Sequence, residues 1–390
     1  MKRRTVWTIL LATASLFILA TRCEYLSQPY FDKLALTLVA GDPPDVAYMD
    51  TLRAPEYIHN GLIFPLDAVL DPKELEDFYP ILLANFQREG KTYAVPRDFQ
   101  TVALLINQDL FDKYGLSSPA NWKELVKAAD LIQTGEREAG HKDFYGIGLT
   151  PNMWNWMPFL YQAGGSLLDP TGTKVTLDTK EAEDALTFYT DLRKRGLAFV
   201  PESSLSNPEQ SWPYGASAEI LSAFAQGKVA MILGPNIFYA MLQNPPQGDK
   251  PAFKVGIQEL PKGPKAQATI GYTVGYGLFD KETAFPGSNA VTLLRFMTGP
   301  EAMDIWEKSV TYMPTRRSRA GIWIEQHPEA RAFMDGVAHL RSYQPAKASF
   351  ANIRTFDQKS TVIIARALGG QIEVKEALNQ LQKLGDELLQ

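Results

Sequence analysis

Two short segments of the sequence carry side chains suited to holding a small polar solute. One is RDFQ at 97–100, which supplies hydrogen-bonding groups, and the other is NMWNW at 152–156, which supplies two large aromatic rings. A sugar presents flat patches of C–H and a rim of hydroxyls, so its binder needs aromatic faces for stacking and planar polar groups for paired hydrogen bonds. Together the two segments indicate binding of a polyhydroxylated molecule.

The polar groups of the first segment are placed by a predicted strand. Arg97, Asp98 and Gln100 come directly before the apolar run 102–106. A buried strand would not tolerate three polar side chains, so we expect them at the mouth of that strand, facing a cleft. The alternative is a solvated loop in which Arg97 and Asp98 pair only with each other.

A second polar pair follows another predicted strand. Asp50 and Arg53 come after the run 45–49, at the C-terminal end where open α/β sheets place ligands. Asp50 and Asp98 also allow a catalytic interpretation, because a glycoside hydrolase needs two carboxylates roughly 5–10 Å apart across a cleft. Neither aspartate lies in a glycosidase motif, so this interpretation remains the rival one.

The aromatic segment points to a cleft as well. Trp154 and Trp156 are one residue apart and cannot both be buried on one face of a helix. We therefore expect one of them to face the solute, Trp154 before Trp156. The alternative is that both belong to a hydrophobic core, as large aromatic residues commonly do.

Composition excludes several other classes of function. The net charge is −5 and no basic run follows residue 4, which argues against binding of nucleic acid. The single cysteine, Cys23, cannot form an internal disulfide, so thiol chemistry is not indicated. The histidines show no metal-ligand spacing, and neither a metal nor a cofactor is expected; they are His59, His141, His327 and His339.

The remaining sequence predicts an α/β protein. Amphipathic periods alternate with short β-branched runs, a pattern typical of α/β layers with mainly parallel sheets. Helices are expected at 121–133, 179–195 and 374–388, and strands at 45–49, 102–106, 229–233 and 254–257. The first helix begins at Asn121 with Glu124 three positions on, which is the spacing of a capping box.

The N-terminus has the pattern of an export signal. Lys2, Arg3 and Arg4 precede an apolar run from Val6 to Ala20, so we expect residues 1–23 to be a signal peptide. The position of Cys23 resembles a bacterial lipoprotein signal, which implies lipidation and anchoring at the outer face of the cell membrane. The bulky residue before it, Arg22, departs from that pattern and leaves a cysteine without lipid as the alternative.

Five motifs follow one another along the rest of the chain: AGDPPDVAYMD at 40–50, GKTYAVPRDFQTVALLINQDLF at 90–111, MPFLYQAGGSLLD at 157–169, FAQGKVAMILGP at 224–235 and KVGIQELPKGP at 254–264. Their order and spacing resemble the extracytoplasmic solute-binding proteins of ABC importers, in the maltose-binding-protein-like class that carries sugars and oligosaccharides. The resemblance implies the two-lobed periplasmic-binding-protein type II fold, with solute held between the lobes and chain crossings near 99–101, 267–272 and 312–316.

The same resemblance assigns lobes and further site residues. It implies a first lobe of 24–100 plus 270–312 and a second of 101–269 plus 313–390. In the family an aromatic residue stacks on the solute near Trp154, and Gln100 aligns with a contacting position. A tryptophan usually follows the Gly-Pro pair at 234–235, where this chain has Asn236 and then Phe238 as candidates, and Tyr272 lies in the glycine-containing cleft loop.

The start of the mature chain departs from the family pattern. A strand–helix–strand unit normally precedes the helix that begins at 30–34, so we expect the first lobe to lack it. The function implied is capture of a carbohydrate or related polyol outside the cytoplasm and delivery to an ABC transporter permease by a monomer that is not an enzyme. The alternatives are an exported glycoside hydrolase and a degenerate, truncated binding protein without transport function.

Overall fold

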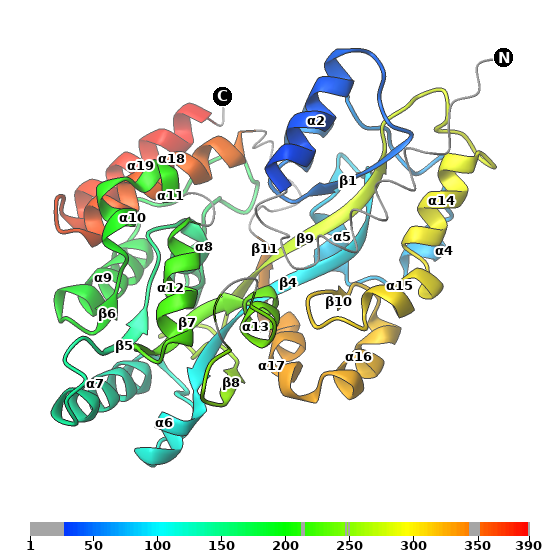
Figure 1. Cartoon of the computed structure of the whole chain (residues 1–390). Helices are drawn as coiled ribbons and strands as arrows, with labels where there is room; N and C mark the ends of the chain where they lie inside the picture. Colours follow the sequence, from blue (N-terminus) through cyan, green and yellow to red (C-terminus); the bar gives the residue numbers. More distant parts are fainter. Residues whose placement is uncertain (1–26, 212–214, 246–247, 249, 343–351, 389–390) are drawn as a thin grey trace.

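The computed structural model describes residues 27–211, 215–245, 248, 250–342 and 352–388. The expected signal peptide and Cys23 lie outside these residues. The main sheet has the strand order β1-β9-β4-β7-β5-β6, and β8, β10 and β11 pair beside this path. Figure 1 shows helices in two groups, one on each side, joined by the long strands β4 and β9.

The strands are β1 Val46–Asp50, β2 Gln87–Arg88, β3 Lys91–Thr92, β4 Ala94–Asn107, β5 Tyr145–Gly148, β6 Ala198–Phe199, β7 Val229–Pro235, β8 Val255–Gln258, β9 Thr269–Leu278, β10 Met313–Pro314 and β11 Leu340–Ser342. The helices of the first half of the chain are α2 Ser27–Val39, α3 Ala54–His59, α4 Pro72–Leu75, α5 Pro80–Ala84, α6 Gln108–Lys113, α7 Trp122–Glu138, α8 Met153–Gln162 and α9 Lys180–Lys194. Those that follow are α10 Glu202–Ser206, α11 Pro208–Ser211, α12 Gly215–Ala225, α13 Asn236–Gln243, α14 Asn289–Met297, α15 Pro300–Trp306, α16 Ala320–Gln326, α17 Arg331–Asp335, α18 Ile353–Leu368 and α19 Val374–Leu388, with 3-10 turns η1 Arg317–Arg319, η2 Pro328–Ala330 and η3 Gly336–His339.

Strand β4 belongs to both halves of the molecule. Its residues 94–101 pair antiparallel with β9, whereas 102–106 pair antiparallel with β7 and 104–107 with β8. The change of partner falls at the first of the expected crossings. The strand is much longer than the predicted 102–106, so the polar residues before it do not form a mouth. Arg97 and Asp98 are buried within the strand, which tolerates them because they form an ion pair with each other.

Two further connections join the halves. β9 follows β8 in the chain, and β10 pairs with β4 at Asp98 and Phe99. After β10, strand β11 pairs in parallel with β9 at Thr269, Ile270 and Gly271, within the second of the expected crossings. Helices α16 and α17 pack into a core cluster shared with α12 and α13.

Local sequence signals position most elements. The capping prediction at Asn121 is confirmed, since its side chain accepts a hydrogen bond from the backbone N–H of Glu124 at the start of α7. The predicted helix 179–195 is α9, whose cap is Thr179. The expectation of mainly parallel sheets is wrong, because only the pairs β5–β6, β5–β7 and β9–β11 run parallel and the crossing strands make the rest antiparallel.

The outer edge of the first lobe's sheet is β1, which pairs with β9 on one side. On its other side, the hydroxyl of Tyr30 in α2 donates to the carbonyl of Tyr48 (3.2 Å) and accepts from its N–H (3.1 Å). The two rings are also stacked, with centroids 4.0 Å apart. One side chain thus supplies the donor and the acceptor that a neighbouring strand would supply at this residue.

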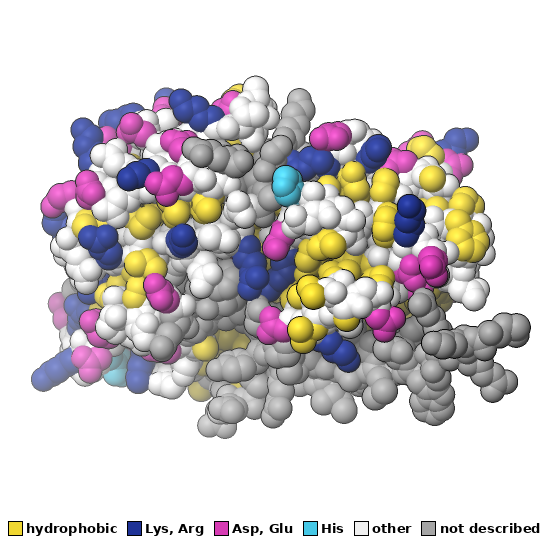
Figure 2. All heavy atoms as spheres, turned by 90° about the horizontal axis from the view of Figure 1, so that it is seen from above, with side chains coloured by type: hydrophobic (Ala, Val, Ile, Leu, Met, Phe, Trp, Pro, Cys, Tyr) yellow, Lys and Arg dark blue, Asp and Glu magenta, His cyan; other side chains and the backbone are white. Residues whose placement is uncertain are grey.

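The surface of the first lobe is more apolar than that of the second. Exposed large hydrophobic side chains gather on α2 and on α14, α15 and the loop before them, and include Leu36, Val39, Phe285, Phe296 and Ile305. Figure 2 shows apolar side chains at the surface of the right-hand half, which contains these elements.

We predict that Tyr30→Phe lowers the free energy of unfolding by about 1–3 kcal/mol, because it leaves a backbone donor and acceptor of Tyr48 without a partner at a covered edge. Chemical denaturation of the variant measures the change. Tyr145→Phe is the matched control, since that hydroxyl meets no hydrogen-bond partner among the described residues. Equal stability of both variants would show that water replaces the Tyr30 hydroxyl at no cost.

Candidate functional site

Three of the ten predicted site residues are partly exposed, and the structure brings these three together. Gln100 of β4 and Tyr272 of β9 lie directly opposite each other in the antiparallel register, so their side chains share one face of the sheet. Trp154, from α8 of the other half, meets Tyr272 edge-to-face with ring centroids 6.1 Å apart and planes at 80°. Gln100, Tyr272 and Trp154 therefore form one cluster, which we call the aromatic–amide cluster, where the halves meet.

The start of α8 fixes which tryptophan reaches this cluster. Asn152 is the N-cap, and its side-chain oxygen accepts hydrogen bonds from the N–H of Asn155 and the hydroxyl of Thr150, both at 3.0 Å. Trp156 then points into the second lobe's core and is fully buried. The structure thus corrects the expectation that Trp156 is a second cleft residue, and Trp154 alone contacts Tyr272.

The two predicted carboxylates lie on the same face of the sheet as Tyr272. Asp50 and Asp98 both lie opposite Val274 of β9, one on each neighbouring strand. Two strand spacings separate them by roughly 10 Å along this row. Both are buried, and each forms an ion pair with an arginine. These partners, Arg53 and Arg97, neutralise the two acids.

Arg97 is held by aromatic rings from four parts of the chain. Its guanidinium carbon lies 5.1–5.9 Å from the ring centroids of Tyr48, Tyr276, Trp306 and Tyr312. One guanidinium nitrogen donates to the Tyr276 hydroxyl at 3.4 Å. Such contacts between a cation and ring faces strengthen when water is excluded.

Burial acts in opposite directions on the pKa values of the two members of this pair. Burial raises the pKa of the Asp98 carboxyl, although the positive charge of Arg97 acts against this. Burial alone would lower the pKa of Arg97, but the negative charge of Asp98 together with the hydroxyls of Tyr276 and Tyr312 outweighs burial and keeps that pKa well above its ordinary value. Arg97 therefore stays protonated, and Asp98 serves as its partner inside the strand.

Asp50 has a structural role besides its ion pair. Its carboxylate accepts from the backbone N–H groups of Leu52 (3.0 Å) and Arg53 (2.9 Å), which shapes the turn into α3. Arg53 stacks on Phe31 of α2, with the guanidinium carbon 3.7 Å from the ring centroid. Across from them, burial and the positive charge of Arg53 lower the pKa of Arg354 at the start of α18.

Asn236 and Phe238 are both buried in the first turn of α13. Asn236 is fully buried, and its amide nitrogen donates to the carbonyls of Val310 (3.0 Å) and Thr311 (2.8 Å). Phe238 is buried in a core cluster and packs against Gly234 so closely that an added Cβ there would lie 2.5 Å from its ring. Asn236 thus ties the end of β7 to the third crossing, and Phe238 packs in the core; a solute contact at either residue stays a prediction.

Sequence reasoning missed a polar chain that joins the halves below the cluster. Tyr161 of α8 donates to the carbonyl of Ser342 (3.0 Å), whose hydroxyl donates to Asn85 (2.7 Å). The Asn85 amide in turn donates to the Thr273 hydroxyl (2.9 Å). These residues are far apart in sequence and carry no local motif, so only a resemblance resolved residue by residue could have pointed to them.

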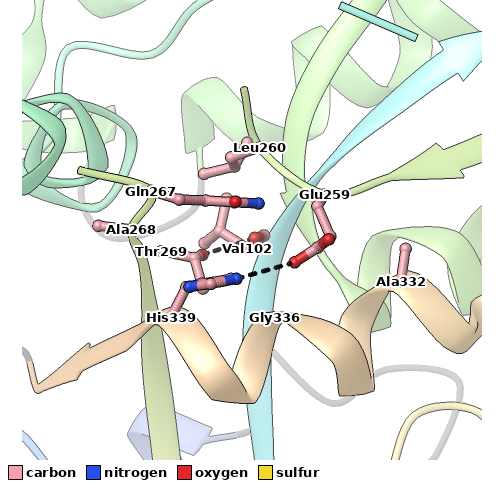
Figure 3. A pocket seen from close by; sticks show the side chains of 9 residues that line it. All are labelled: Val102, Glu259, Leu260, Gln267, Ala268, Thr269, Ala332, Gly336 and His339. Carbon is pink, nitrogen blue, oxygen red and sulfur yellow. Dashed lines mark hydrogen bonds and ion pairs between the residues drawn. The ribbon is translucent and has the colours of Figure 1, made fainter. Parts of the chain in front are cut away.

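A small hollow lies beside the first two crossings. Figure 3 shows it between β4, the connection before β9 and η3, with the ring of His339 pointing toward the carboxylate of Glu259. The two charged ends are 3.9 Å apart and both side chains are part-exposed. The hollow has about 10 Å³ of space, enough for one water molecule. It therefore cannot hold a sugar.

In the part of the chain that the structure describes, no group of three or more His, Cys, Asp or Glu side chains could hold a metal ion. None of the helices within the described ranges combines the length and the apolar character that crossing a bilayer requires.

We predict that Arg97→Leu lowers the free energy of unfolding by roughly 3–5 kcal/mol, because it leaves the Asp98 carboxylate buried without its counter-charge. The double variant Arg97→Leu, Asp98→Leu should recover most of this loss, since neither charge then remains. Thermal and urea unfolding of both variants measure the difference. A double variant as unstable as the single one would show that packing against the four rings, not charge, is what Arg97 contributes.

Comparison with known proteins identifies the family to which this architecture belongs. The model of the bacterial extracellular solute-binding protein family matches residues 25–304. The chain belongs to this family. A protein of Deinococcus radiodurans described as a probable ABC transporter-binding protein is 28% identical over 264 residues, 65% of this chain and 58% of that protein. A binding protein of Brucella abortus is 29% identical over 249 residues, 62% of this chain and 55% of the relative. The chain thus matches little more than half the length of these relatives.

Solved structures of ABC substrate-binding proteins share the fold. A Listeria monocytogenes protein in complex with cycloalternan superposes with a TM-score of 0.74 at 21% identity, covering 93% of this chain and 89% of that one. The GacH receptor of Streptomyces glaucescens, solved unliganded and with acarbose, gives 0.75 at 22%, covering 92% and 87%. Maltose-bound MalE3 of T. maritima gives 0.73 at 23%, covering 92% and 88%. The predicted type II periplasmic-binding-protein fold is confirmed.

Proposed function

We propose that this solute-binding protein captures an uncharged carbohydrate or polyol at the aromatic–amide cluster and delivers it to an ABC transporter permease. The observation that carries the proposal is the meeting of Trp154, Tyr272 and Gln100 from both halves. An indole and a phenol face offer stacking surface to a sugar ring, and a carboxamide pairs with two adjacent hydroxyls. Closure of the halves around the solute would withdraw these contacts from water and commit the complex to delivery.

The charges around the cluster favour a neutral solute. Asp50 and Asp98, the two acids on its face of the sheet, are each matched by an arginine. A charged solute would have to break one of these buried pairs, which leaves an isolated charge at a cost of several kcal/mol. The hydroxyl groups of a neutral solute require only hydrogen-bond partners and leave both ion pairs intact. Two of the similar structures hold cycloalternan and maltose, which supports the carbohydrate class.

The same pairing argues against glycoside hydrolysis. A general acid must give up a proton and a nucleophile must reach the anomeric carbon, but both aspartates are buried against guanidinium groups. We therefore propose binding without catalysis, by an exported monomer in the periplasm or at the outer face of the membrane. Lipidation at Cys23 would provide the membrane attachment, and mass spectrometry of the mature N-terminus tests it.

A thermal-shift screen across sugars and polyols tests the proposal as a whole. A binder gains stability with its solute in proportion to the logarithm of concentration. Release of sugar from aryl glycosides or oligosaccharides above buffer background would instead establish the glycosidase. No shift with any neutral solute would favour the truncated relic without transport function.

We predict that Trp154→Ala weakens binding of the solute found in that screen by on the order of 1–3 kcal/mol while the fold persists, because a cleft ring contributes mainly stacking and buried area. Isothermal titration calorimetry gives the affinity and circular dichroism the fold. Phe199→Ala, a half-buried aromatic truncation on the far edge strand β6, serves as the control and should bind normally. Normal affinity of the Trp154 variant would remove this residue from the site.

Gln100→Ala should weaken the same binding by about 1–3 kcal/mol, since it leaves a sugar hydroxyl unpaired in a closed cleft. Gln100→Glu distinguishes hydrogen bonding from space filling, because it keeps the shape and the acceptor oxygen but replaces the donor NH2 with a charged acceptor oxygen. Affinities measured by calorimetry should fall in both variants. If the alanine variant alone binds as the parent does, the solute does not touch Gln100.

A further inference from the structure

One edge of β9 has no strand partner at two residues beside the aromatic–amide cluster. β4 pairs along one edge of β9 over 271–277, so β1 and β11 must both lie along the other edge. β11 runs parallel to β9 and ends opposite Gly271, whereas β1 runs antiparallel and ends opposite Val274. The two strands therefore point toward each other and leave Tyr272 and Thr273 between their ends, a place in the described chain that we call the edge gap.

Side chains close the edge gap. The Thr51 hydroxyl donates to the carbonyl of Thr273 (3.0 Å) and accepts from its N–H (2.9 Å), in addition to a backbone bond between the same residues. The Thr273 hydroxyl accepts from the amide of Asn85 (2.9 Å), whose oxygen accepts from the hydroxyl of Ser342 (2.7 Å). Hinge motions are absorbed at a few residues at the ends of elements, and the ends of β1 and β11 meet here.

The second lobe reaches the same place through the hydroxyl of Tyr161. This hydroxyl donates to the carbonyl of Ser342 at 3.0 Å. The ring is buried, and burial raises the pKa of Tyr161, so the hydroxyl keeps its proton and remains a donor. Ser342 thus receives the second lobe at its carbonyl and holds the first lobe, through Asn85, with its hydroxyl.

Helix α8 carries both this contact and the ring proposed to meet solute. Trp154 and Tyr161 are seven residues apart, roughly two helical turns, and so lie on one face of α8. Trp154 meets Tyr272 in the edge gap, and Tyr161 meets the end of β11. The next residue, Gln162, is fully buried and donates to the carbonyl of Ala268 just before β9 (2.8 Å). The C-terminal end of α8 is thus fixed at the second crossing, and a change in the tilt of α8 moves Trp154 relative to Tyr272.

We propose that the Tyr161 hydroxyl is a positioning group that holds the lobes in the orientation in which Trp154 meets Tyr272. Its hydrogen bond to Ser342, together with the bond from Ser342 to Asn85, forms a latch between α8 and α5. When the latch opens, α8 tilts on its buried anchor and the aromatic–amide cluster separates. The inference rests on the proposed function in one respect, namely that solute is held while these residues are together.

The test measures the distance between the lobes by electron spin resonance on the full chain. Nitroxide labels are attached at Lys33→Cys of α2 and Asn379→Cys of α19, exposed positions in the two groups of helices of Figure 1, in a Cys23→Ser background. Without solute, the parent should populate a short-distance form. Tyr161→Phe should lower the ratio of short to long form about fivefold, the effect of losing one net hydrogen bond, and Ser342→Ala should do the same.

The matched control is Tyr114→Phe, which removes a hydroxyl bond to Glu136 of 2.9 Å inside the second lobe and should leave the distances unchanged. The double variant Tyr161→Phe, Ser342→Ala should shift the distances no further than the larger single change, because either change opens the same latch. With the solute found in the thermal-shift screen, Tyr161→Phe should speed dissociation about fivefold and leave association unchanged, which a general loss of stability would not do.

Four results would overturn the proposal. They are a parent without a short-distance form, a Tyr161→Phe variant with the distances of the parent, a control that shifts as far as this variant, and a double variant whose shift is the sum of the single ones. A screen that finds no solute would remove the proposed function but not the latch, because the distances are measured without solute. Ser342→Ala keeps the test valid should Tyr161→Phe disturb the second lobe, since the Ser342 side chain is half-buried and outside α8.

Discussion

One strand with two sets of partners organises the whole molecule. Because β4 pairs with β9 along its first half and with β7 and β8 along its second, the two sheets share a continuous backbone and cannot separate. The other connections are placed relative to it, since β10 pairs with its middle. Gln100 lies next to the change of partner, so it keeps its place in the first lobe while standing where the second lobe approaches. Relative motion of the lobes therefore has to occur as bending or twisting about this strand.

Burial of charge explains why most of the polar candidates hold the fold rather than face solvent. Asp50, Arg53, Arg97 and Asp98 look from sequence like four independent hydrogen-bonding groups. In the structure they are two ion pairs, and each pair is also tied to aromatic rings or backbone N–H groups. Such an arrangement leaves the neutral groups, an amide and two aromatic rings, as the exposed ones. The chemistry of the site follows from this sorting of charged groups inward.

Local features could be predicted from the sequence itself. Contacts between distant segments could be predicted only from the resemblance to the family. Asn121 and Glu124 are three residues apart, so the start of α7 could be predicted from spacing alone. The length of β4 could not, because Arg97 and Asp98 are acceptable inside a strand only when rings from β1, α15 and the third crossing surround them. Likewise, only the packing of the second lobe's core shows that Trp156 is buried while Trp154 is partly exposed. The proximity of Trp154, Tyr272 and Gln100 followed the family pattern, although their contact with a solute remains a prediction.

The enclosure of Arg97 has a consequence for the order in which the protein can fold. Its four rings come from residues 48, 276, 306 and 312, and the pair Thr51 and Thr273 shows that this lobe joins segments 222 residues apart. During synthesis, much of the second sheet is complete once β8 has emerged, but the first lobe must wait for β9 and the third crossing. Contacts so distant in sequence form slowly, because long loops must close first. The enclosure of Arg97 is thus completed only after the third crossing has emerged, and until then Arg97 and Asp98 remain solvated and the middle of β4 stays open.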